Sequence, residues 1–197
     1  MAMSPRLLRP LGPRGRFRSL RQGLLAYWPL NEVAASGDVT AVDFTGRGND
    51  LTSNNSVLSV TGKVGNAREF VRTNSEYLAG THADLNLGDI AWTIVFWFLV
   101  PTGATNSRFQ IFAKDVSGAR QILCSYNFTA VGVNEADSLF FQHYTSTGGA
   151  VSNAISGVSR NAWHFVTMTH ANNASIIACD LDRTSAVNLT RASGTWA

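Results

Sequence analysis

Paired carboxylates are the first chemistry to look for in this sequence, because hydrolysis of a glycosidic bond needs two of them, one as acid and one as nucleophile or base. The chain has four glutamates, Glu32, Glu69, Glu76 and Glu135. Only Glu135 has a second acid at a strand-like spacing, Asp137, and this pair begins in a predicted turn. The solvated end of a hairpin explains the pair, so we expect no catalytic residue and no enzyme.

The sequence also gives no support for a catalytic serine or cysteine nucleophile or for a metal site with cysteine ligands. Cys124 and Cys179 have no histidine nearby in sequence and no metal-ligand spacing, so we expect both to be buried small hydrophobic residues. Neither a Gly-x-Ser-x-Gly nor a Gly-x-x-x-x-Gly-Lys motif occurs. His164 and His170 share a strand face but lie about 20 Å apart in an extended chain, too far to bind one ion.

Strands rather than helices must position these side chains. The 197 residues are 45% hydrophobic, 15% charged and 10% aromatic, and Ser, Thr, Asn and Gly are plentiful. The length suits about one domain with one core, and the charged fraction is below the roughly 25% that is usual. The longest apolar run, Ile90–Val100, is too short to span a bilayer as a helix.

From Gly23 onward, short apolar or alternating runs are separated by polar turn clusters, which is the pattern of an antiparallel all-β domain. Both alternating faces of Trp92–Val100 are apolar, which predicts a central strand covered on both sides. Ser175–Asp182 places Asp180 and Asp182 on one face, which becomes solvated towards the end of the strand. The predicted strands are Leu24–Leu30, Ala67–Val71, Tyr77–Ala79, Trp92–Val100, Arg108–Lys114, Gln121–Asn127, Ser138–Thr145, Val151–Ile155, Trp163–His170 and Ser175–Leu181.

Five segments within residues 23–182 occur in a telling order: GLLAYWPLNE, DFTGRGNDL, VTGKVGNAREFVRTNSEYLAG, LNLGDIAWTIVFWF and NAWHFVTMTHANNASIIACDLD. Together they resemble the laminin-G-like jelly rolls of the concanavalin A-like lectin and glucanase superfamily. The resemblance implies an all-β, two-sheet antiparallel jelly-roll sandwich with one concave face. Because that architecture hosts lectins, hydrolases, adhesion modules and structural parts, it does not imply a function.

The resemblance also points to the loop of residues 43–50 as a metal site, where Asp43 and Asn49 match the family pattern best. Asp and Asn oxygens with turn carbonyls could surround calcium, the one cofactor that we consider. The alternative is an Asx-stabilised turn, in which the same side chains bond backbone amides. The glucanase pattern Glu-x-Asp-x-x-Glu has Phe140 in place of its last carboxylate, which again disfavours hydrolysis.

Members of the superfamily continue with further strands past the position of Trp196. We therefore expect that the domain of residues 23–197 lacks its last strands, because the chain is a fragment or because another chain supplies them. Either arrangement leaves an exposed sheet edge, which invites pairing.

Residues 1–22 form a basic arm. Without its six arginines, the rest of the chain has 10 basic against 13 acidic residues. Three prolines and two glycines exclude a continuous helix, so we predict an extended segment whose mixed apolar and cationic side chains lie along an acidic, grooved surface of another protein. A mitochondrial presequence and a nucleic-acid-binding tail are the weaker alternatives. The predicted anchoring residues are Arg6, Arg9, Arg14, Arg16, Phe17, Arg18 and Arg21.

A jelly-roll body on an anchoring arm predicts a non-enzymatic structural or display protein of a large assembly. Laminin-G-like domains with short anchoring segments resemble accessory proteins of bacteriophage particles, such as capsid decoration, head fibre or tail proteins. We expect the chain on the exterior of a virion, oligomeric within the particle, with other structural proteins as partners and without membrane contact.

The alternative function is an extracellular glycan-binding, lectin-like module or adhesin. Lectins hold sugars with exposed aromatic and polar side chains, and Tyr77, Tyr126 and Tyr144 are candidates here. Each of the three is equally compatible with an ordinary position inside a sandwich, so the glycan-binding residues stay unknown at this stage. The two functions are compatible, since a particle can hold polysaccharide through its decoration.

Overall fold

The structure is a computed structural model that describes residues 23–85, 87, 90–103, 108–116, 119–129, 136–144, 150–172 and 175–190. Every strand pair in these residues is antiparallel. Their only helices are two short 3₁₀ turns, Arg72–Asn74 (η2) and Ala83–Leu85 (η3). The predicted all-β class is confirmed, and the described chain divides after Leu85 into two compact units.

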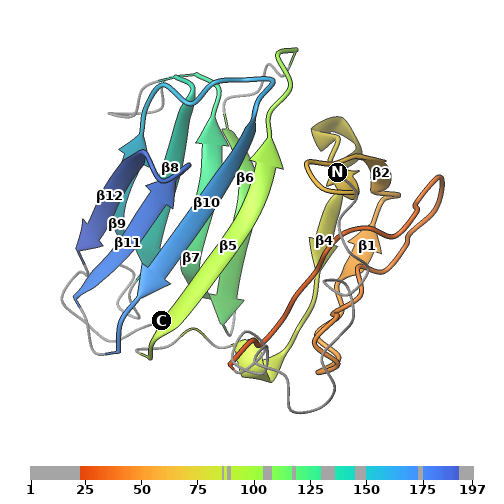
Figure 1. Cartoon of the computed structure of the whole chain (residues 1–197), viewed down its shortest axis with the longest axis horizontal. Helices are drawn as coiled ribbons and strands as arrows, with labels where there is room; N and C mark the ends of the chain where they lie inside the picture. The colour runs from red at the N-terminus through yellow and green to blue at the C-terminus, as the bar shows by residue number, and fades with distance from the viewer. Residues whose placement is uncertain are drawn as a thin grey trace, which may run out of the picture. The chain divides into compact units, whose positions relative to one another are not determined.

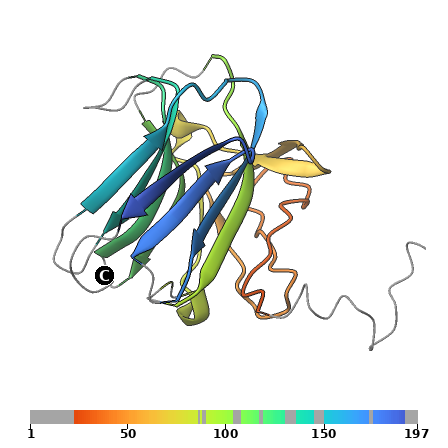
Figure 2. The same cartoon turned by 60° about the vertical axis from the view of Figure 1, so that its left-hand side comes forward.

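The second unit contains two four-stranded antiparallel sheets, in the orders β12-β11-β10-β5 and β6-β7-β8-β9. Figures 1 and 2 show them as two layers, with β5, β10, β11 and β12 on one side and β6 to β9 on the other. This arrangement agrees with the predicted sandwich. The strands are Trp92–Leu99 (β5), Arg108–Val116 (β6), Ala119–Asn127 (β7), Ser138–Tyr144 (β8), Ala150–Ile155 (β9), Trp163–His170 (β10), Ile176–Leu181 (β11) and Ser185–Thr190 (β12).

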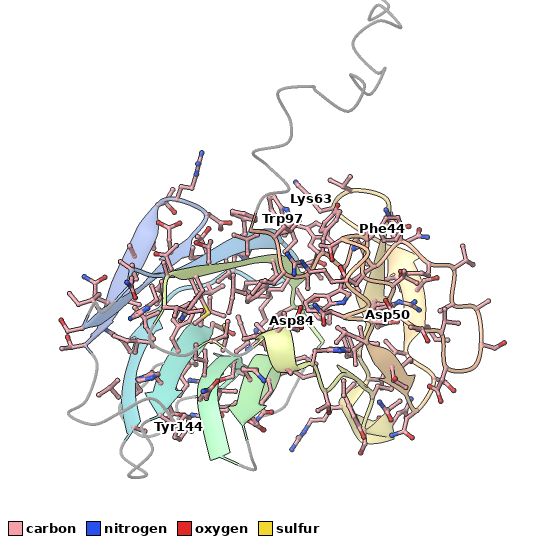
Figure 3. All side chains as sticks on the ribbon, turned by 90° about the horizontal axis from the view of Figure 1, so that it is seen from below. Phe44, Asp50, Lys63, Asp84, Trp97 and Tyr144 are labelled. Carbon is pink, nitrogen blue, oxygen red and sulfur yellow. The ribbon has the colours of Figure 1, made fainter. Side chains whose placement is uncertain are left out.

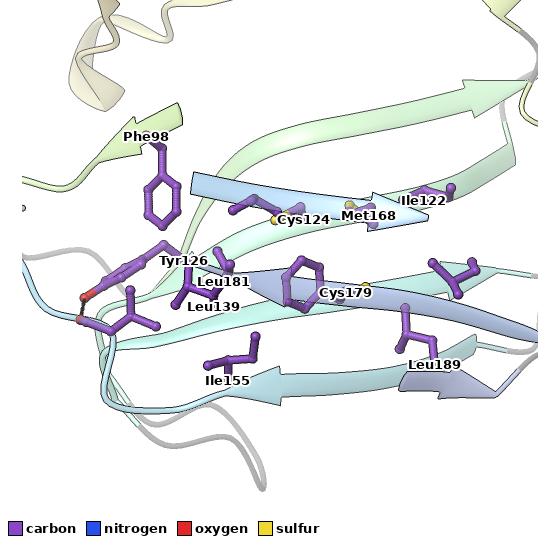
Figure 4. Packing of buried hydrophobic residues seen from close by; sticks show 14 of the residues in the cluster. Phe98, Ile122, Cys124, Tyr126, Leu139, Ile155, Met168, Cys179, Leu181 and Leu189 are labelled. Carbon is purple, nitrogen blue, oxygen red and sulfur yellow. Dashed lines mark hydrogen bonds between the residues drawn. The ribbon is translucent and has the colours of Figure 1, made fainter. Parts of the chain in front are cut away.

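A hydrophobic core fills the space between these two sheets. Met168 and Cys179 contribute from one layer, and Ile122, Cys124 and Leu139 from the other (Figure 4). Strand β10 alternates strictly between half-buried and buried residues, so one of its faces lines the core. Both cysteines are fully buried, as predicted, and burial raises the pKa of the Cys179 thiol to about 12.

The prediction that Trp92–Val100 is a central strand was wrong. Among the described strands, β5 lies at the edge of its sheet and pairs only with β10. Its inner face packs on the core, but Val95 and Trp97 on the other face are 54% and 47% exposed. An apolar run on both faces therefore marks here an exposed apolar surface, not a second covering layer.

The first unit, described from residue 23 to residue 85, has little regular structure. Strand β1 (Thr52–Asn54) pairs with β4 (Tyr77–Ala79), and β2 (Leu58–Thr61) pairs with β3 (Asn66–Glu69). Its fully buried apolar residues are small, Ala34, Ala41 and Val57. Apolar packing alone therefore gives this unit little to hold it together.

The predicted strand Leu24–Leu30 is also wrong, because this segment forms no strand. Its backbone groups bond side chains of a loop instead of a neighbouring strand: the Tyr27 amide donates to Asp43 Oδ1 (3.0 Å), and the Leu24 carbonyl accepts from Arg47 Nε (3.1 Å). Leu30 has a φ of 58°, a left-handed conformation that ends any extended run.

The other strand predictions are confirmed, two of them to the residue (Tyr77–Ala79 and Trp163–His170) and the rest with ends that shift by one or two residues. The strands β1, β2 and β12 were not predicted. The anchoring arm of residues 1–22 lies outside the described residues. No helix in the described part of the chain is long and apolar enough to cross a membrane.

Candidate functional site

The predicted metal loop is built around the carboxylate of Asp43, which is 4% exposed. Its Oδ1 accepts hydrogen bonds from the amides of Tyr27 (3.0 Å) and Thr45 (2.9 Å). Its Oδ2 accepts from the Thr45 hydroxyl (2.6 Å) and the Asn49 amide (3.2 Å). These contacts are those of an Asx-stabilised turn, the alternative that the sequence left open.

Asn49 extends the same network to the chain that precedes the loop. Its Nδ2 donates to the Leu25 carbonyl (2.8 Å) and to Asp84 Oδ2 (3.0 Å), and its carbonyl accepts from Trp28 Nε1 (2.7 Å). Asp84 and the neighbouring Asp50 are labelled in Figure 3. The structure thus brings the predicted pair Asp43 and Asn49 together, as a clamp that holds residues 25–28.

The hydrogen bonds of Asp43 decide its charge. Burial opposes ionisation, but the donors from Thr45, Tyr27 and Asn49 outweigh burial and lower the pKa of this carboxyl to about 2. Both oxygens already face N–H or O–H donors, which a cation would have to displace, so this donor set does not fit calcium. In the described residues, no three His, Cys, Asp or Glu side chains lie together as metal ligands. The calcium site that the family resemblance implies is tested by the melting experiment described in the Discussion.

The three tyrosine candidates for sugar binding lie in different environments. Tyr126 is fully buried, and its hydroxyl, with one proton to donate, lies 2.8 Å from the Val158 carbonyl oxygen and 3.0 Å from Asp137 Oδ1, so it faces no ligand. Tyr77 is 52% exposed on β4. Tyr144 is half-buried at the end of β8 and bonds Gln142 (Figure 3). Tyr77 belongs to the first unit, and Tyr126 and Tyr144 belong to the second.

A Ser-His-Asp cluster, which the sequence did not suggest, lies where β10 begins. His164 Nδ1 is 2.6 Å from Asp182 Oδ2, and His164 Nε2 is 3.2 Å from the hydroxyl of Ser159. Asp182 Oδ1 also accepts the Phe165 amide (2.7 Å). Burial opposes ionisation of Asp182, but the bonds from His164 and Phe165 outweigh it and lower the pKa of this carboxyl.

This cluster does not have the geometry of an activated serine. A general base must present a free lone pair to the hydroxyl, whereas His164 Nε2 lies closer to the Ser159 carbonyl oxygen, at 2.8 Å. Both ring nitrogens therefore face acceptor oxygens, and the ring bridges Asp182 to the loop before β10. We interpret the cluster as a structural latch that fixes Asp182.

The outer face of β5 and β10 carries an open hollow next to this latch. It is lined by Trp97, Phe165, Asp182 and Arg183. Trp97 and Phe165 are paired across the two strands, and their ring centres are 5.0 Å apart at an angle of 49°. Trp97 lies on the side of β5 away from the second sheet (Figure 3). Two aromatic rings thus adjoin a carboxylate and a guanidinium.

Sequence reasoning missed this hollow because it treated Trp97 as a covered residue. The signal was present in the alternation of β5, which places Thr93, Val95 and Trp97 on one face. Asp182 was correctly assigned to the solvated side, but its closeness to Trp97 depends on the pairing of β10 with both β5 and β11. Register between distant strands cannot be obtained from one sequence.

Two predicted groups lie outside this geometry. Glu135 and all seven anchoring residues of the arm fall outside the described residues. Asp137, the partner proposed for Glu135, accepts from Arg160 Nε (2.6 Å) as well as from Tyr126, so its carboxylate holds the β8 and β10 ends together.

A scan against protein-family models finds no match, and no curated protein matches the sequence.

Proposed function

We propose that this chain is a non-enzymatic display protein of a large assembly, most similar in kind to a phage decoration, head fibre or tail accessory protein. In this proposal the arm of residues 1–22 docks to other structural proteins, and the β-sandwich faces the surrounding medium. The low charged fraction of 15% and the small neutral polar residues suit such a surface.

One observation supports the non-enzymatic part of this proposal more than any other. The carboxylates best placed for chemistry in the described chain, Asp43, Asp137 and Asp182, all accept hydrogen bonds from backbone amides, arginine, histidine or tyrosine. A catalytic acid pair needs one carboxyl that keeps its proton and one that is free to attack. Carboxylates used in this way stabilise loops instead.

The finer topology that we propose is a laminin-G-like jelly roll. The described chain passes from β5 to the other sheet at β6, makes three hairpins through β9, and returns to the first sheet at β10. Strand β5 thus lies beside β10 through a long connection, next to the hairpin-connected strands β10, β11 and β12. Two antiparallel sheets, joined by connections longer than a hairpin, are also what a jelly-roll sandwich contains. The family resemblance of the sequence favours the same topology.

Truncation of the arm tests the display function. We expect a chain of residues 23–197 to be folded and to be absent from the assembly that the full chain joins, because the arm supplies the attachment. Replacing the six arginines by serine, with Leu7, Leu8, Leu11, Phe17 and Leu20 retained, separates charge from burial as the source of attachment. Unchanged occupancy of the truncated chain in purified particles contradicts the proposal.

A fluorophosphonate reagent tests the absence of a serine hydrolase. It forms a covalent bond only with an activated serine hydroxyl, so we expect no adduct at Ser159 in the intact protein by mass spectrometry. An adduct at Ser159 that disappears in His164→Ala would show that the latch is a catalytic triad.

Glycan recognition is the second candidate function, and one observation favours it. The hollow at Trp97 joins exposed aromatic surface to charged hydrogen-bonding groups, the combination that small-molecule sites use for affinity and orientation. Recognition and display do not exclude each other, and they are tested separately.

A further inference from the structure

We propose that the hollow formed by Trp97, Phe165, Asp182 and Arg183 is a binding site for a neutral saccharide, which places one pyranose ring against the indole of Trp97. This inference rests on the recognition function proposed above, and it is independent of display. It assigns that function to one face of one sheet.

The aromatic side chains of the site, Trp97 and Phe165, are partly exposed to solvent, although burial would be more favourable for them. Trp97 is 47% exposed, and a tryptophan is among the residues that gain most from burial. Phe165 stands beside it at 49°, so the two rings form an angled wall. The C–H face of a pyranose carries partial positive charge and suits the electron-rich face of an indole.

The carboxylate of the site is held rigidly. Asp182 Oδ1 accepts the Phe165 amide at 2.7 Å, and Oδ2 contacts His164 Nδ1 at 2.6 Å. His164 is itself 7% exposed and bonded to the Ser159 carbonyl. Each carboxylate oxygen keeps a further lone pair, to which a sugar hydroxyl can donate a hydrogen bond. A fixed acceptor costs little entropy on binding.

The guanidinium of Arg183 supplies donors. In the described part of the chain, only the backbone amide of Arg183 has a partner, Asp180 Oδ1 at 2.8 Å. The exposed side chain is thus a set of five N–H donors next to Trp97 without an internal acceptor. A saccharide, whose hydroxyls both donate and accept, can use Asp182 and Arg183 at once.

The turn that presents these two groups adds an independent indication. Asp182 and Arg183 have φ values of 53° and 59°, and the Thr184 amide bonds the Leu181 carbonyl at 3.1 Å. This is a tight turn with both central residues left-handed, which favours Asn and Gly, not arginine. Unfavourable backbone conformations that persist gather at binding sites.

The charges around the hollow select a neutral ligand. Asp182 and Arg183 line the hollow with one negative and one positive charge, and Asp180, whose Oδ1 accepts the Arg183 amide, adds a second carboxylate nearby. A phosphate, sulfate or uronate group in the hollow would meet the Asp182 carboxylate at close range, and like charges repel there. A neutral hexose or N-acetylhexosamine meets no such repulsion.

A glycan array followed by calorimetry tests the site. The full chain is applied to neutral gluco-, manno-, galacto- and N-acetylhexosamine oligosaccharides and to uronate- and sialate-bearing ones, and the best neutral probe is titrated in solution. We expect Trp97→Ala to weaken that binding at least ~10-fold, as central aromatic contacts do, and Arg183→Gln to weaken it about 3-fold or more.

Val95→Ala is the matched control, because Val95 is exposed on the same face of the same strand but does not line the hollow. Its affinity should stay within about twofold of wild type. Thermal melting of each variant confirms that the sandwich is folded.

The outcomes separate the two proposals. If the wild-type chain binds no saccharide, both the site and the recognition function fail, and display is unaffected. If it binds but Trp97→Ala and Arg183→Gln bind equally well, the site is overturned and recognition stands. Binding confined to the acidic probes overturns the neutral ligand class.

Discussion

The two units of this chain are stabilised in opposite ways. After Leu85, the core cluster of buried apolar residues lies entirely within the second unit, between its two four-stranded sheets. In residues 23–85, the described part of the first unit, the fully buried apolar residues are Ala34, Ala41 and Val57, while side chains such as Asp43, Asn49 and Arg68 bond backbone groups far along the chain. Burial of hydrophobic area supports one unit, and directed hydrogen bonds support the other.

We expect the second unit to tolerate substitutions that the first unit does not. A hydrophobic core accepts many apolar residues of similar volume. A carboxylate that satisfies four donors has no equivalent among the other residues, because each donor must meet an acceptor at a fixed position. The predictions below test that contrast, beginning with the largest effect.

The core of the second unit should be the most sensitive to truncation. Phe141 is fully buried on β8, so Phe141→Ala should lower the free energy of unfolding by about 3–5 kcal/mol through lost transfer energy and a cavity. Urea unfolding measures the loss. Ile176→Ala is the control, because Ile176 is 41% exposed and should cost less than about 1 kcal/mol. Equal losses in the two variants would mean that the core does not dominate.

Asp43→Ala should come next and should act locally. It leaves four donors without an acceptor, three of them backbone amides, at a cost of about 2–4 kcal/mol. Amide hydrogen exchange should speed up at Tyr27, Thr45 and Asn49 and remain slow in β7 and β10. Asp38→Ala, an exposed carboxylate with two donors, is the milder control.

The carboxyl of Asp43 also makes the stability of the first unit depend on pH in the acid range. Its pKa in the folded protein, about 2, is below the ordinary 3.8, so its contribution is present above about pH 4 and is lost as the pH falls towards 2. The measure is the protection factor, which is the exchange rate corrected for the intrinsic pH dependence of amide exchange. Protection factors in residues 25–49 that do not fall between pH 5 and pH 2 would contradict the role of Asp43.

A smaller effect is expected at alkaline pH from Tyr126. Burial, with the bond to Asp137, raises the pKa of its hydroxyl from 10.0 to about 12. Because the pKa in the folded protein lies above that in the unfolded chain, the protonated hydroxyl contributes to the free energy of unfolding below pH 10. This contribution is lost as the pH rises to 12. The tyrosinate absorbance should include a late-titrating step that is absent in Tyr126→Phe. Tyr144→Phe should leave it in place.

Calcium should have the smallest effect. A ligand that binds only the folded state raises the melting temperature, but the carboxylate of Asp43 is already occupied by four donors. We expect the melting temperature to be the same in millimolar calcium and in chelator. A rise that Asp43→Asn abolishes would establish the metal site that the family resemblance implies.

The same contrast decides what the sequence could predict. Strands such as Trp163–His170 and Ile176–Leu181 follow from alternation along the sequence, because period-two burial is a local property. Leu24–Leu30 has a similar apolar pattern but forms no strand, since its backbone bonds are taken by Asp43, Arg47 and Asn49. The loop residues Asp43 and Asn49 were found by type and spacing. Their contacts with Leu25, Trp28 and Asp84 depend on distant chain segments.

The left-handed turn at Asp182 and Arg183 sets a limit on engineering this protein. Asn-Gly is the pair that such a turn prefers, and glycine at position 183 would relieve a left-handed arginine by about 1 kcal/mol. The same exchange would remove the guanidinium from beside Trp97. A search for thermostable variants would therefore select the Asn-Gly turn, and a search for ligand affinity would select against it. In this hairpin, stability and ligand affinity therefore favour different residues at positions 182 and 183.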